Sequence, residues 1–295
     1  MRSRPAAYLR NSLLIALAVG VIGAVSGCRI RDRGESTPDD DGGEELSAAE
    51  QEIVDDSTQL EESVRGGSGL AAIPTLAFAG RREPLTLARA VQRQAFAPLV
   101  FFPKGCASVE TEGNVVTYTF DGCTGPLGLS NMSGREVVTF RPGPTAGSIE
   151  MTMASDGLSL DGRAFQHDAV AVLTIEDGGR RLAYAGSLSG TSPLGAPTEH
   201  VSDLVIATDE ASLCATLDGT TSGTVGPRGL ELAFAGFKRC APIGTCPSGT
   251  ITVSGRRRLV AVTVAFDGTD VATITTPRGG EIDFDLECTP LADAP

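Results

Sequence analysis

A long series of short β-branched segments, separated by turn residues, occupies the chain from Phe101 onward. Apolar and polar residues alternate within them, the pattern of a strand that buries one face. No helical pattern interrupts the series, so we expect a mainly β fold, an antiparallel meander or Greek key arranged as a sandwich or a strongly curved sheet. The expected strands cover residues 115–120, 148–153, 169–175, 182–188, 204–207, 213–217, 230–234, 250–253, 259–266, 271–274 and 282–286.

Turn signals lie between these segments, and glycine in each of them supplies the conformations that tight turns require. They are Glu112-Gly113-Asn114, Asp156-Gly157, Asp161-Gly162, Asp177-Gly178-Gly179 and Asp267-Gly268. The connections are therefore expected to be short hairpins.

One or two short helices are expected before the β region. Ser47-Ala48-Ala49-Glu50 fits a capping box and predicts a helix over 48–64. A second apolar stripe predicts a helix over 85–97, which Pro98 would end.

The first 28 residues are typical of an export signal. Three arginines precede a nearly continuous apolar stretch over residues 13–25, and small residues lead to Cys28. The ending Val25-Ser26-Gly27-Cys28 resembles the lipobox of bacterial lipoproteins. The resemblance implies cleavage before Cys28, diacylglycerol on its sulfur and acylation of the new N-terminus. Arg29, in place of the aspartate that retains enteric lipoproteins in the inner membrane, favours the outer membrane, on either its periplasmic or its surface side.

Composition divides the chain into four parts. We expect a signal peptide over 1–27, an acidic disordered tether over 28–45, a helical N-terminal segment over 46–100 and a disulfide-stapled β domain over 101–290. The chain carries 24 Lys and Arg residues against 37 Asp and Glu, a formal net charge of −13. This acidity argues against nucleic acid as a partner, because phosphate would be repelled.

Seven cysteines are present, and lipidation of Cys28 would leave an even six for disulfides in an oxidising compartment. The expected pairs are Cys106–Cys123 around a hairpin, Cys240–Cys246 around a short loop and, by elimination, Cys214–Cys288. A metal site is the alternative, but the chain has no CxxC motif and only two histidines, so neither a metal nor a cofactor is expected.

Catalytic motifs are absent from the sequence. There is no GxSxG elbow and no phosphate-binding loop; His167 lies within an expected strand and His200 in an expected loop after Pro197. Both histidines are expected to be polar residues of the surface or of a half-buried position. Asp283 and Asp285 would share the wet face of one strand, and 256–258 is a basic cluster between two strands.

Segments 118–129, 213–219 and 239–247 resemble uncharacterised lipoproteins of myxobacteria, a resemblance that covers roughly residues 106–288 and implies strands and disulfides but no activity.

The leading prediction is a non-enzymatic, lipid-anchored protein of the cell envelope whose β domain binds a partner or has a structural role. One alternative is a carrier of lipid or another apolar ligand, with the helices over an apolar cavity. The other is a hydrolase with scattered catalytic residues.

Overall fold

The computed structural model describes residues 85–124, 131–192, 195–209, 211–212, 214–240, 246–255 and 260–286. The expected signal peptide, Cys28, the acidic tether, the helix over 48–64, the basic cluster 256–258 and Cys288 all lie outside these residues.

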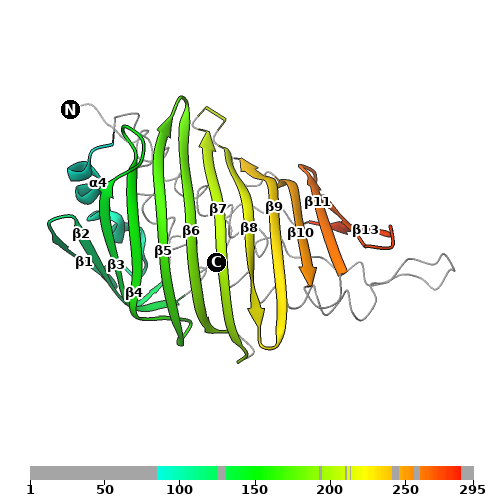
Figure 1. The fold of residues 1–295 in the computed structure, drawn as a ribbon, viewed down its shortest axis with the longest axis horizontal. Helices are drawn as coiled ribbons and strands as arrows, with labels where there is room; N and C mark the ends of the chain where they lie inside the picture. The colour runs from blue at the N-terminus through cyan, green and yellow to red at the C-terminus, as the bar shows by residue number, and fades with distance from the viewer. Residues whose placement is uncertain are drawn as a thin grey trace.

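One antiparallel sheet of thirteen strands makes up most of the described chain (Figure 1). Each strand pairs with its neighbours in the sequence, so the sheet is a meander, and within the described residues it does not close. The mainly β prediction is confirmed, and the Greek-key alternative is wrong for these strands. The strands are β1 (Ala107–Glu112), β2 (Val115–Thr124), β3 (Asn131–Pro142), β4 (Ile149–Leu160), β5 (Arg163–Glu176), β6 (Gly179–Thr191), β7 (Pro197–Asp209), β8 (Cys214–Val225), β9 (Arg228–Cys240), β10 (Ser248–Gly255), β11 (Val260–Asp267), β12 (Val271–Thr275) and β13 (Glu281–Asp285).

Two strands were not predicted. β1 is mostly polar and charged, and β3 begins with a polar, glycine-containing stretch that hides the alternation further along it. The Asp156-Gly157 signal does not end a strand either. It lies inside β4, where the register with β5 shifts between Ala154 and Ser159, so this glycine serves an irregularity in the ladder rather than a hairpin.

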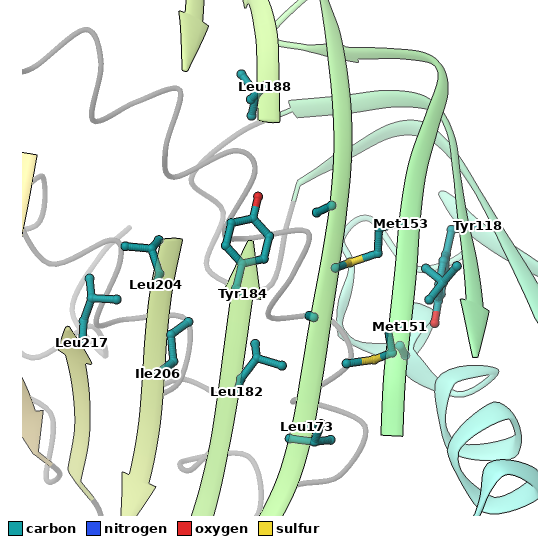
Figure 2. Close-up of a cluster of buried hydrophobic side chains, with 14 of the residues drawn as sticks. Tyr118, Met151, Met153, Leu173, Leu182, Tyr184, Leu188, Leu204, Ile206 and Leu217 are labelled. Carbon is teal, nitrogen blue, oxygen red and sulfur yellow. The ribbon is translucent and has the colours of Figure 1, made fainter. Parts of the chain in front are cut away.

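One face of the sheet carries the core. Exposed and buried residues alternate strictly along much of β5, β6 and β7, and the buried apolar residues belong to one hydrophobic cluster. Figure 2 shows part of it, with side chains from β2 and from β4 to β8. Burial of each large apolar side chain stabilises the fold by roughly 1.5–3 kcal/mol, so this face fixes the register of the strands.

Helix α4 (Leu87–Gln94) confirms the helix expected over 85–97, although it is shorter. Thr86 caps its N-terminus by accepting a hydrogen bond from the Arg89 backbone N–H at 3.3 Å. The helix contacts β2 and β3, and the Tyr118 hydroxyl donates to the Gln94 carbonyl at 2.6 Å. After it comes a 3-10 helix, η1 (Ala97–Val100), with Pro98 in its first turn. Among the described residues, no helix has the length and apolar character needed to span a bilayer.

Two disulfides join described residues, and they indicate an oxidising compartment. Cys106–Cys123 confirms one predicted pair. Cys214 pairs with Cys240, so the predicted Cys240–Cys246 and Cys214–Cys288 bonds are wrong. The reason is the β8–β9 hairpin, whose register sets these two residues opposite each other with their Cα atoms 3.9 Å apart. Cys246 is disulfide-bonded as well.

Candidate functional site

A row of four paired residues crosses the buried face in the middle of the sheet. His167 on β5 lies opposite Leu188 on β6, Leu188 lies opposite His200 on β7, and His200 lies opposite Gly223 on β8. Both histidines are buried, with exposed fractions of 0% and 4%. The prediction of surface or half-buried histidines, with His200 in a loop, is therefore wrong. β7 starts at Pro197, a position where a strand tolerates proline, and His200 alternates in phase with buried Ser202.

His167 is the centre of a buried polar cluster. Its Nδ1 lies 2.9 Å from Glu136 Oε1, and its Nε2 lies 3.1 Å from the Tyr184 hydroxyl. Its backbone N–H donates to Ser155 Oγ at 2.8 Å. Glu136 and Tyr184 are also almost fully buried. Side chains from β3 and β6 therefore converge on the imidazole of β5, and the contact from β3 reaches across β4.

Glycines make room for this cluster. A Cβ on Gly186 would overlap the hydroxyl of Tyr184, and a Cβ on Gly223 would overlap the Cβ of His200. These two positions need glycine for close approach, because any larger side chain would push the tyrosine or the histidine out of place.

Burial sets the protonation of these groups. It raises the pKa of the Glu136 carboxyl, an effect that the hydrogen bond to His167 opposes, and it raises the pKa of the Tyr184 hydroxyl. Burial, helped by the electrostatic influence of nearby His167, lowers the pKa of His200 to about 4. His200 is therefore neutral at neutral pH.

The cluster resembles the base of a hydrolase in only one respect. A histidine between a carboxylate and a hydroxyl is the arrangement of a general base, but here the hydroxyl is the buried phenol of Tyr184 rather than an exposed serine. In this part of the sheet, the buried atoms Glu136 Oε2 and His200 Nδ1 have no hydrogen-bond partner among the described residues. The arrangement supplies no accessible nucleophile, and it belongs to the interior of the sheet.

The opposite face of the same strands is exposed and carries a shallow hollow of about 410 Å³. Its lining side chains are the residues on either side of the buried row, and most are short. We call this feature the exposed hollow; it is lined by Gln166, Asp168, Ser187, Ser189, Glu199, Val201, Ser222 and Thr224, with Leu188, His200 and Gly223 in its floor.

Apolar side chains lie beside the exposed hollow. Val201 is 61% exposed and Val170 is 42% exposed, high values for valines in the middle of a long sheet. On β6, exposed Ala185 lies opposite Val170, and exposed Ala183 lies one row further from Val201. This surface was not predicted from the sequence, because alternation assigns one side of every strand to solvent but does not show which residues become neighbours across strands.

The remaining predicted residues form no site. Asp283 and Asp285 alternate with Ile282 and Phe284 as expected, and Asp283 accepts a hydrogen bond from the Thr273 hydroxyl at 2.8 Å. In the part of the chain that the structure describes, no three His, Cys, Asp or Glu side chains gather where they could hold a metal ion.

Comparisons with family models, with curated proteins and with solved structures find no match to this chain. A function must therefore be inferred from the geometry of the buried and exposed faces of the sheet.

Proposed function

We propose that this chain is a lipid-anchored protein of the cell envelope whose β domain binds a partner through the exposed face of its sheet. The observation that carries the proposal is the combination of exposed Val170 and Val201 with the adjoining exposed hollow. Clustered apolar side chains on a soluble surface mark interaction sites more often than isolated ones do.

The position in the cell is the second part of the proposal. The disulfides indicate an oxidising compartment, and Cys28 with its preceding small residues supports lipid attachment. Two or more acyl chains would hold the protein stably on a membrane, in our proposal the outer membrane. Within this arrangement we favour a strongly curved single sheet over a sandwich, since one face of β5–β7 is buried and the other is open to a partner.

The proposed role is non-enzymatic. The one histidine placed between an acid and a hydroxyl is buried with both of its partners. The exposed hollow on the other face offers hydroxyls and carboxylates but no histidine or cysteine side chain at its surface.

Site-specific photo-crosslinking tests the proposal. A benzophenone side chain at Val201 would be compared, in intact cells, with the same group at Phe96, since both positions are 61% exposed and Phe96 lies away from the strands of the hollow. We expect a discrete crosslinked product from Val201 and none from Phe96. Equal products from both positions, or none from Val201, would contradict binding through this face.

A further inference from the structure

Apolar residues of this face form an ordered patch, in which Val172 and Val205 are half-buried and the others are exposed. One row across the sheet pairs Val172 with Ala183 and Ala183 with Val205. The adjacent row pairs Val170 with Ala185. We call these residues, together with Val201 two positions before Asp203 on β7, the valine patch.

Carboxylates bound the valine patch on several sides. Glu150 on β4 lies opposite Val172 and, on its other side, opposite Arg141 of β3, while Asp218 on β8 lies opposite Val205, so an acid flanks each end of this apolar row. By strand spacing these two carboxylates are roughly 19 Å apart. Asp168 and Asp203 lie beside the patch on β5 and β7, and both are exposed.

Positive charge on this side of β5–β8 is confined to one end. Arg181 lies in the next row toward the β5–β6 turn, opposite Thr174 and Ala207. The lining of the exposed hollow, at the other end of the patch, includes Asp168 and Glu199 and no Lys or Arg. The surface therefore presents an apolar centre in a negative field.

We infer that the partner bound at this face is a polypeptide that presents lysine or arginine side chains around an apolar strip. The inference rests on the proposed function and adds the chemistry of the partner. The valines supply apolar contact area that binding would remove from water. The surrounding carboxylates attract a basic partner, speed its association and repel acidic partners. An extended segment with alternating basic and apolar residues matches the period of the strands.

The test uses the full chain with Cys28→Ser, so that it can be handled without a membrane. Two fluorescent nine-residue peptides serve as probes, one alternating lysine with valine and the other alternating glutamate with valine. Fluorescence anisotropy gives their Kd values at low and high salt. We expect the lysine peptide to bind, the glutamate peptide to bind at least tenfold more weakly, and salt to weaken the lysine complex.

Neutralising variants assign the effect to this face. Asp168→Asn with Asp203→Asn should weaken binding of the lysine peptide about fivefold, the loss expected for two exposed ion pairs. Glu110→Gln with Glu112→Gln makes the same change of charge on exposed positions of β1, at the far edge of the sheet, and should leave Kd unchanged.

The outcomes separate the inference from the proposed function. Equal binding of both peptides, or equal losses in the two double variants, would overturn a basic partner. Failure of the lysine peptide to bind while Val201 still crosslinks in cells would overturn the basic partner and leave a binding face. Failure of both peptides together with no crosslink from Val201 would overturn the inference and the proposed function together.

Discussion

Glu136 on β3 and His167 on β5 are hydrogen-bonded across the intervening strand β4, with Oε1 2.9 Å from Nδ1. Both side chains are buried. The bond therefore joins strands that share no backbone ladder, and it fixes how the interior side chains of three strands lie relative to one another.

Removal of one partner is expected to be strongly destabilising. His167→Ala would leave the buried Glu136 without its hydrogen bond, and Glu136→Ala would leave Nδ1 of His167 without a partner; each should lower the free energy of unfolding by about 3–5 kcal/mol. Urea unfolding monitored by circular dichroism measures this. Replacement of both residues by leucine should cost less than the sum of the two single changes. Additive losses would show that the pair is not coupled.

The pKa of His200 predicts how stability changes with pH. Its folded value of about 4 lies below the ordinary 6.5, so the unfolded chain binds the proton more tightly between these two values. This contribution to stability is fully present above pH 6.5 and is lost as pH falls toward 4, by up to about 3 kcal/mol.

A variant isolates that contribution from the titration of the many carboxyl groups. His200→Leu removes the proton site and the unpartnered Nδ1 from the buried row. Urea midpoints of both proteins would be measured at several pH values from 7 to 4.5. The wild-type protein should lose more stability than the variant over this range, and parallel curves would contradict the prediction.

Gly186 is predicted to be intolerant of a side chain. Gly186→Ala places a methyl group on the Tyr184 hydroxyl, which must move away from His167, and a loss of about 1–3 kcal/mol follows from overpacking. Tyr184→Leu removes both the hydroxyl and the ring carbon Cζ, the two atoms nearest to the added methyl group. In that background the same glycine substitution should cost clearly less, as measured by a double-mutant cycle in urea. If Gly186→Ala lowered the free energy of unfolding equally in both backgrounds, the methyl group would not be clashing with Tyr184.

The alternation of apolar residues predicted most of the strands, because one buried face imposes period two wherever its residues are apolar. The same rule failed where that face is polar. Glu136 and His200 occupy interior positions in phase with Val138 and Leu204. Because both are polar, they interrupt the alternation of apolar and polar residues from which a strand is predicted. The run Val137 to Phe140 was the available signal for β3.

Residues that meet across strands could not be predicted from the sequence. The Glu136–His167 bond, the valine patch and the Cys214–Cys240 pair all depend on register, which is set by hairpin lengths and by local shifts such as the one between Leu217 and Gly219. Spacing along the chain gives the phase of each strand but not the offset between two strands.

The Cys214–Cys240 disulfide should account for a measurable part of the stability. It closes a loop between neighbouring strands with a sequence separation of 26, for which the chain-entropy model gives about 3.5 kcal/mol. Cys214→Ser with Cys240→Ser should lower the free energy of unfolding by about that amount. Peptide mapping without reduction should recover the two cysteines in one linked fragment. Recovery of Cys240 linked to Cys246 would contradict the pairing.

Replacement of Cys28 tests the anchor. Cys28→Ser removes the thiol that would carry diacylglycerol, so the protein should move from the membrane pellet to the soluble fraction of the cell envelope. Without the lipid, electrostatic attraction would not hold the protein on the membrane, because its net charge of −13 is repelled by anionic headgroups. Cys246→Ser serves as the control, because it also removes a cysteine but leaves residues 25–28, the proposed lipobox, unchanged. Membrane association that persists in the Cys28 variant after a salt wash would contradict lipid anchoring at this residue, since a salt wash removes proteins held by charge alone.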